Sequence, residues 1–250
     1  MEHAAFACLA AISIHSLRLA SLKPGEPVFI LGLGLLGQIA CQVAHAWEMR
    51  VLAADINPMR VKLALENGAD DGGAVGQDDI ASLVKGFTGG KGARAVIIFA
   101  STPSQQPLKL AAEVCGDGGK IVAPGMIGLN IPRRVFYEKE LSLVVPRFAG
   151  SLNSHIAATV EHNLSISDSV AYNMTEFLKL AAANKVNMES LITHHFQIGE
   201  AEKAYALLKG KERGKSLGVL LSYVSRRQDA SGDRESASGR LEDKIILRAT

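Results

Sequence analysis

The sequence predicts an α/β fold in which helices cover both faces of a doubly wound, six-stranded parallel sheet. Two observations carry this prediction: short apolar segments alternate with helical segments through the first 150 residues, and a glycine-rich loop joins the first apolar segment to a helix. Parallel neighbours need crossover connections, which are almost always right-handed and usually helical. A regular alternation of strand and helix is therefore what such a sheet requires.

The first elements follow from apolar patterning and turn residues. Residues 4–20 are apolar on all sides and predict a mostly buried helix that ends before the turn Lys23–Gly25. The uninterrupted apolar run Pro27–Leu31 lies between that turn and Gly32, so it predicts a strand buried on both faces. The glycine loop then opens a helix that continues to about Trp47.

The same alternation continues along the chain. The later strands are expected at Arg50–Asp55, Gly73–Val75, Ala95–Ala100, Lys120–Ala123 and Leu141–Val145, and the helices at Pro58–Asn67, Asp78–Phe87 and Leu108–Cys115. Tyr137, Glu138 and Lys139 are interpreted as a solvated turn that leads into the sixth strand.

Beyond Gly150 the alternation stops. Two amphipathic helices, Ala171–Ala183 and Glu200–Lys209, precede a final strand at Leu217–Tyr223. We therefore expect a linking helix at 1–22, the sheet domain at 23–150, C-terminal helices and a strand at 151–224 that pack on or beside it, and a disordered tail at 225–250. Within that tail, Glu242–Arg248 is expected as a strand only if a neighbouring strand pairs with it.

Composition and charge argue against several classes of protein. The net charge is +2 and the basic residues are scattered, so no nucleic-acid-binding face is expected. No stretch reaches the roughly 18 uncharged apolar residues of a membrane span, and the apolar N-terminus lacks the basic region of a secretory signal. Cys8, Cys41 and Cys115 lie far apart in apolar stretches, which favours the reducing cytoplasm over a disulfide framework.

The loop between Gly32 and Gly37 predicts a dinucleotide site because it has the spacing G-x-G-x-x-G, follows a buried strand and opens a helix. Gly32 permits the tight turn, Gly34 lets the backbone approach a pyrophosphate, and Gly37 allows the helix to lie close to the strand. Free amides at the helix start, on Leu35 and Leu36, would hold the phosphates with the help of the helix dipole.

Asp55 ends the second strand, 18 positions after Gly37. Its carboxylate would accept hydrogen bonds from the adenosine ribose and repel a 2′-phosphate, so NAD is expected rather than NADP. Ile56 follows it in the same site, and Arg60 would stack on adenine or, as a weaker alternative, meet a 2′-phosphate.

Two later strand ends are expected at the same crevice, because ligands of open α/β sheets bind outside the carboxyl ends of strands where the strand order reverses. The residues expected to hold the nicotinamide ring through their backbone groups are Ala100, Ser101 and Thr102, and Pro124, Gly125 and Met126. For the side chains of Ser101 and Thr102, an ordinary surface turn is an equal alternative.

Two other interpretations of the loop remain. The glycines would merely end a strand while Asp55 caps the helix that begins near Pro58, or the loop would hold S-adenosylmethionine in a methyltransferase. The methyltransferase pattern fits the first two strands and not the later ones.

Further motifs lie on either side of the loop and Asp55, at Leu22–Val28, Lys62–Ala64, Gly68–Asp70, Gly118–Val122, Ile192–Phe196 and Glu200–Tyr205. Together they resemble the medium-chain dehydrogenase/reductases, the zinc-type alcohol dehydrogenase relatives, from about Ala4 to Tyr223. The segment Phe136–Leu141 resembles the branch in which such a module precedes a second oxidoreductase domain.

This resemblance implies a Rossmann domain and a homodimer formed through the sixth strand, Leu141–Val145. It also implies an N-terminal GroES-like domain that supplies the catalytic zinc ligands, and the chain as given begins after it. No zinc is expected here, since a catalytic zinc needs three protein ligands and Cys8 is interpreted as a core residue. His194 and His195 are neighbours in an extended segment, so their side chains are expected on opposite faces.

The expected function is NAD(H) binding by the Rossmann module of an alcohol dehydrogenase-like oxidoreductase. Hydride transfer is expected only if another chain or a longer parent supplies a separate catalytic domain. The alternative is a non-catalytic NAD(H)-binding regulatory or structural subunit.

Overall fold

The structure, a computed structural model, describes residues 2–150, 169–210, 216–224 and 242–247. The chain divides into two compact units. We call Ala7–Asn187 the sheet unit, and Met1–Phe6 together with Met188–Thr250 the terminal unit. The expected boundary after residue 150 therefore lies within the sheet unit, because helix α8 (Val170–Ala182) packs against the N-terminal helix α2 (Ala7–Ala20).

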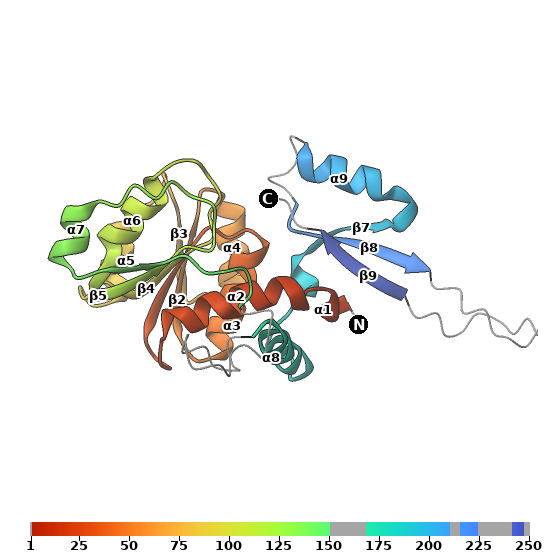
Figure 1. Cartoon of the computed structure of the whole chain (residues 1–250), viewed down its shortest axis with the longest axis horizontal. Helices are drawn as coiled ribbons and strands as arrows, with labels where there is room; N and C mark the ends of the chain where they lie inside the picture. The colour runs from red at the N-terminus through yellow and green to blue at the C-terminus, as the bar shows by residue number, and fades with distance from the viewer. Residues whose placement is uncertain (1, 151–168, 211–215, 225–241, 248–250) are drawn as a thin grey trace, which may run out of the picture. The chain divides into compact units, whose positions relative to one another are not determined.

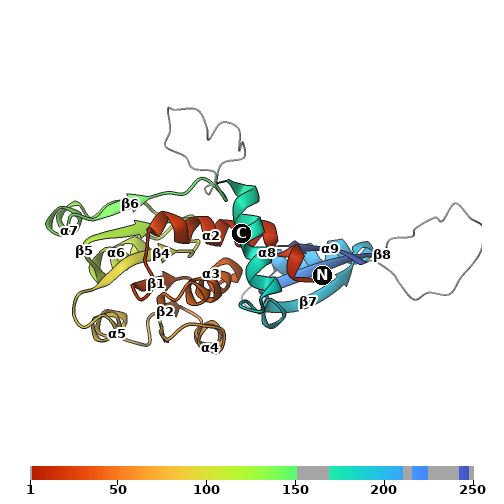
Figure 2. The same cartoon turned by 90° about the horizontal axis from the view of Figure 1, so that it is seen from below.

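The sheet unit contains the predicted six-stranded parallel sheet. Its strands are β1 (Pro27–Leu31), β2 (Arg50–Asp55), β3 (Asp71–Ala74), β4 (Ala93–Ile98), β5 (Cys115–Val122) and β6 (Ser142–Val144). Their order is β3-β2-β1-β4-β5-β6, and Figure 2 shows the run from β6 to β2. This is the strand order of a Rossmann sheet, and it reverses between β1 and β4, so a ligand crevice is expected where these two strands end.

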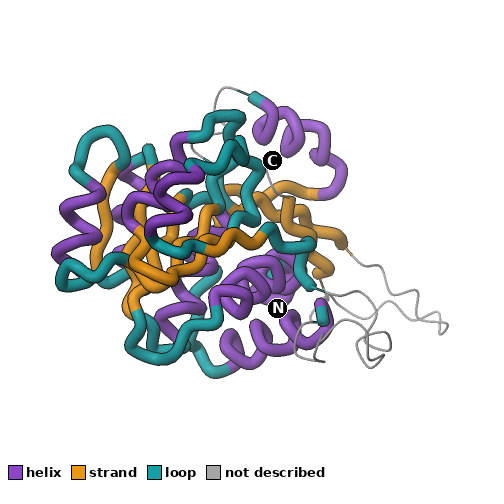
Figure 3. The backbone as a smooth tube through the Cα atoms, turned by 60° about the vertical axis from the view of Figure 1, so that its left-hand side comes forward, coloured by secondary structure: helices purple, strands orange, loops and turns teal. Residues whose placement is uncertain are grey.

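Helices cover both faces of this sheet (Figures 1 and 3). One face carries α2, α3 (Leu35–Ala46) and α4 (Pro58–Glu66), and the other carries α5 (Ile80–Phe87), α6 (Gln106–Val114) and α7 (Arg133–Glu138). Phe29 of β1 and Val96 of β4 are fully buried in one cluster with Leu108 of α6. Burial of such a side chain contributes roughly 1.5–3 kcal/mol, so this packing fixes the sheet that carries the loop ends.

Two predicted elements of this region differ in the structure. The helix expected over residues 4–20 is two helices, α1 (Glu2–Ala5) in the terminal unit and α2 in the sheet unit, with Phe6 between them. The turn expected before the sixth strand is helix α7, which has no fully buried residue and packs on the core only through half-buried Val135 and Phe136, too few positions to show a helical period. An ion pair of 2.8 Å between Arg134 and Glu138 spans one turn of α7.

The terminal unit has a three-stranded sheet of order β7-β8-β9. Its elements are α1, η3 (Glu189–Leu191), β7 (Ile192–Gln197), η4 (Ile198–Glu200), α9 (Ala201–Lys209), β8 (Gly218–Val224) and β9 (Glu242–Leu247). Strand β7 runs parallel to β8, and β9 runs antiparallel to it. Ala204 and Leu208 of α9 pack on Val219 and Leu221 of β8.

Strand β9 corrects the expectation that residues 225–250 form a disordered tail. Glu242–Leu247 pairs with the edge of β8. Strand β8 is therefore the neighbour that a strand in this segment needed. The remainder of the expected tail lies outside the described residues. In the described part of the chain, no helix has both the length and the apolar character that crossing a membrane requires.

Candidate functional site

The glycine loop lies at the carboxyl end of β1, where the strand order reverses. Gly32 has a positive φ of 96° and donates its N–H to the carbonyl of Ala54 at 2.8 Å. A Cβ atom on Gly32 would collide with the backbone of Ala100, and one on Gly37 would collide with the carbonyl oxygen of Gly32. The packing of the chain itself therefore requires glycine at both positions.

Gly34 differs from its two neighbours because the protein leaves open space beside it. Its φ is −67°, which any residue adopts, and no heavy atom lies within 4 Å of a Cβ placed there. Gly34 also begins helix α3 without a side-chain cap, and the first bond of the helix runs from Gln38 N–H to Gly34 C=O at 2.9 Å. The amides of the first turn and this open space together fit an approaching phosphate group.

Asp55 ties the end of β2 to the glycine loop. Its side chain is only 6% exposed, and its two carboxylate oxygens accept hydrogen bonds from Leu33 N–H at 2.6 Å and Asn57 N–H at 2.8 Å. An ionised carboxylate accepts about four hydrogen bonds, so capacity for two ligand hydroxyls remains. The anchoring bond to Leu33 was not predicted from the sequence, because its donor and acceptor lie 22 residues apart.

Gln38 is a second residue of this region that sequence reasoning missed. It is fully buried, and its amide nitrogen Nε2 donates to the carbonyl of Leu33 at 3.3 Å and to that of Arg60 at 2.7 Å. The signal in the sequence is a polar residue immediately after Gly37, in a helix whose neighbouring positions are apolar. Ser13 of α2 holds the same loop from another side, since its hydroxyl donates to the carbonyl of Leu36 at 2.8 Å.

The predicted adenosine residues follow β2 at the same edge of the sheet. Ile56 comes directly after Asp55 and is 78% exposed. Arg60 lies in the first turn of α4, whose N-cap is Asn57 with its side-chain oxygen accepting from Met59 N–H at 2.9 Å. The structure thus brings both residues to the edge where the glycine loop lies.

The two later strand ends also meet there. Ala100, Ser101 and Thr102 follow β4, and Pro124, Gly125 and Met126 follow β5. Gly125 N–H donates to the carbonyl of Ile98 at 2.9 Å, and Thr102 N–H donates to that of Met126 at 2.8 Å. The two segments are therefore joined, and all residues predicted for the site lie at the carboxyl ends of β1, β2, β4 and β5.

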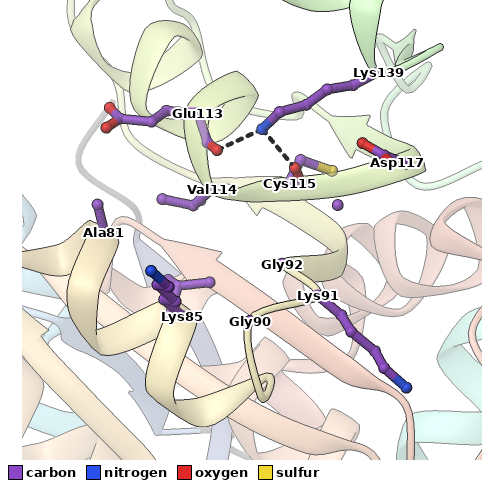
Figure 4. A pocket seen from close by; sticks show the side chains of 12 residues that line it. Ala81, Lys85, Gly90, Lys91, Gly92, Glu113, Val114, Cys115, Asp117 and Lys139 are labelled. Atoms are coloured by element: carbon purple, nitrogen blue, oxygen red, sulfur yellow. Dashed lines mark hydrogen bonds between the residues drawn. The ribbon is translucent and has the colours of Figure 1, made fainter.

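A cavity of about 650 Å³ lies at the opposite edge of the sheet, where β4 and β5 begin (Figure 4). Lys139 crosses it and donates to the carbonyls of Ala112, Glu113 and Cys115 at 3.0, 2.6 and 2.9 Å, so its ammonium group caps the end of α6. Burial raises the pKa of Cys115 to about 11, which keeps this thiol protonated near neutral pH. The cavity therefore lies apart from the glycine loop and offers no activated nucleophile.

The metal-ligating residue types are dispersed. Cys8 is exposed, so its interpretation as a core residue is wrong, since helix α2 turns this position away from its buried face. Among the residues with described positions, no three His, Cys, Asp or Glu side chains lie close enough to hold a metal ion. Along β7, half-buried His194 stacks on Phe196 while His195 is exposed, as the alternation of a strand predicts.

Comparison with known proteins adds four findings. A family model described as zinc-binding dehydrogenase matches residues 36–182. The chain is 27% identical over 222 residues to "Probable D-xylulose reductase A" of Aspergillus clavatus, covering 85% of this chain and 54% of that protein. A short chain alcohol dehydrogenase of E. coli CFT073, complexed with NADH, has a TM-score of 0.67 at 20% identity, over 86% of this chain and 57% of its own.

The fourth finding is a protein of Sinorhizobium meliloti 1021 bound to NADP, with a TM-score of 0.66 at 17% identity, over 98% of this chain and 59% of its own. At these identities the two solved structures support the fold. The chain spans about half the length of the curated relatives it matches.

Proposed function

We propose that this chain, which belongs to the zinc-binding dehydrogenase family, binds NAD(H) at the glycine loop and is the cofactor-binding part of an alcohol dehydrogenase-like oxidoreductase. The observation that carries the proposal is Gly34. Its glycine identity has no explanation in the packing of the chain, and the open space beside it suits a pyrophosphate held by the first amides of α3.

The preference for NAD over NADP is part of the proposal and depends on Asp55. Its carboxylate accepts two backbone N–H groups and has room for the two hydroxyls of an adenosine ribose. The negative charge disfavours a 2′-phosphate at the same position. Similar folds bind either form of the cofactor, since one neighbour carries NADH and another NADP.

When bound, a nicotinamide dinucleotide accepts or donates a hydride at its ring. The chain's own contribution is to orient that ring, with the backbone groups of Ala100–Thr102 and Pro124–Met126 at the carboxyl ends of β4 and β5. We propose that the groups acting on the substrate belong to a catalytic domain outside these 250 residues, on another chain or in a longer parent. A chain without such a domain would bind NAD(H) as a regulatory or structural subunit.

We further propose a homodimer formed through β6. Within the described residues this strand pairs only with β5, so its other edge is unpaired, and Val145 beyond it is 59% exposed. An unpaired apolar edge is suited to pairing with its own copy about a two-fold axis. The three free cysteines favour a cytoplasmic location.

The test is a calorimetric titration of the purified chain with NADH and then with NADPH. We expect saturable NADH binding and weaker NADPH binding. Gly34→Ala places a methyl group in the proposed phosphate position and is expected to weaken NADH binding roughly tenfold, a loss of about 1.4 kcal/mol.

Gly86→Ala is the matched control, because its Cβ also meets no atom within 4 Å but lies in α5, away from the loop. It should leave NADH affinity unchanged. A folded sample that binds neither cofactor, or equal affinities for Gly34→Ala and wild type, would contradict the proposal.

A further inference from the structure

We propose that Gln38 is a positioning residue that fixes the glycine loop against helix α4 and thereby sets the discrimination between NADH and NADPH. This inference depends on the proposed NAD(H) function. The backbone of Leu33 is held on both sides, since its N–H donates to Asp55 at 2.6 Å and its carbonyl accepts from Gln38 Nε2 at 3.3 Å. The same Nε2 donates to the carbonyl of Arg60 at 2.7 Å.

One buried amide therefore connects three parts of the site: the loop, the end of β2 through Leu33 and Asp55, and the first turn of α4. The space beside the 2′ position of an adenosine ribose would be bounded by Asp55 and by the start of α4. Because Gln38 ties the start of α4 to the loop, it limits how far these two boundaries separate. A rigid boundary admits a hydroxyl more readily than the larger, charged phosphate.

Gln38 is used through its donor and not through its acceptor. Gln38 is fully buried, and its side-chain oxygen Oε1 has no hydrogen-bond partner in the described part of the structure. A buried amide oxygen without a partner is unfavourable, so the glutamine is favoured by the two bonds of Nε2, which an apolar side chain of similar length would remove. The donor Nε2 is the part of the side chain that the protein uses.

Gln42, one turn further along α3, provides the contrast. It is also buried, but both ends of its amide are paired: Nε2 donates to the carbonyl of Asn187 at 3.0 Å, and Oε1 accepts from Asn187 N–H at 2.5 Å. These bonds connect α3 to the segment after α8, remote from the glycine loop. Gln42 therefore has the same side chain, helix and burial, without a contact to the proposed site.

The experiment compares Gln38→Met with Gln42→Met in the full 250-residue chain, using calorimetric titrations with NADH and NADPH and a thermal melt of each protein. For Gln38→Met we expect the NADH dissociation constant to rise at least fivefold, and the NADPH constant to rise less, so that their ratio narrows. For Gln42→Met we expect a lower melting temperature and an unchanged ratio.

An unchanged ratio of the two dissociation constants in Gln38→Met would overturn the inference, whatever happens to its stability. Should that variant fail to fold, Gln38→Leu provides the same test, because it also removes the donor and adds no charge to the buried site. If wild type binds neither cofactor, the proposed function fails instead, which separates the two outcomes.

Discussion

Replacing Asp55 by alanine tests how much the hydrogen bonds of this one carboxylate to the glycine loop contribute to the stability of the protein. The substitution leaves two backbone N–H groups without acceptors, those of Leu33 and Asn57. Leu33 is fully buried, so its unpaired N–H costs about 1–3 kcal/mol, whereas half-buried Asn57 can turn to water and adds less. We expect a total loss of about 2–3 kcal/mol from a stability of roughly 5–15 kcal/mol.

The assay is thermal unfolding followed by circular dichroism, with and without NADH. For a chain of this size each kcal/mol corresponds to roughly 2–4 °C, so Asp55→Ala should melt about 4–12 °C below wild type. Asp55→Asn keeps one acceptor oxygen and should lose about half as much. A melting temperature for Asp55→Ala within about 2 °C of wild type would refute the reasoning, because it would mean that Leu33 N–H finds another partner.

Three further predictions concern other parts of the sheet unit. Gly37→Ala forces a methyl group against the carbonyl of Gly32, so the melting temperature of this variant should fall well below that of Gly34→Ala; equal melting temperatures would argue against the close packing. Val145→Lys places a charge at the exposed end of β6, so the proposed dimer should become a monomer in analytical ultracentrifugation. A dimer that persists in this variant would exclude the interface through β6. A thiol reagent at pH 7.5 should modify one cysteine of the native chain, the exposed Cys8, and all three cysteines after unfolding. Burial protects the other two thiols and raises the pKa of Cys115 to about 11. Modification of a second thiol in the native chain would contradict this prediction.

Those elements that were predicted at their observed bounds have local signals at both ends. Strand β1 lies between a turn and Gly32, and β2 ends at Asp55 just before the helix start at Pro58. The family resemblance depends on motifs of the same local kind, and the family match confirms it. The carboxyl ends of four strands could be expected at one edge because parallel topology places them there.

Other features could not be predicted because they depend on contacts between distant residues. Strand β9 was predicted only on the condition that a neighbouring strand pairs with it, and no pattern within Glu242–Leu247 indicates that this neighbour is β8. The bond between Leu33 and Asp55 and the bridge made by Gln38 likewise join residues about 22 positions apart. Cys8 was misplaced for a related reason, because an apolar run does not show which face of its helix the fold covers.

The residues of the two units become available for folding at different stages of synthesis. The sheet unit is one continuous stretch, Ala7–Asn187, so all its strands are synthesised before the segment that follows Asn187. The terminal unit joins segments from either side of the sheet unit, since α1 lies against β9. That contact encloses the whole sheet unit, and contacts of such long sequence separation form slowly. Strand β8 therefore keeps one edge unpaired until Glu242–Leu247 has been synthesised, so β9 completes the terminal unit after the sheet unit.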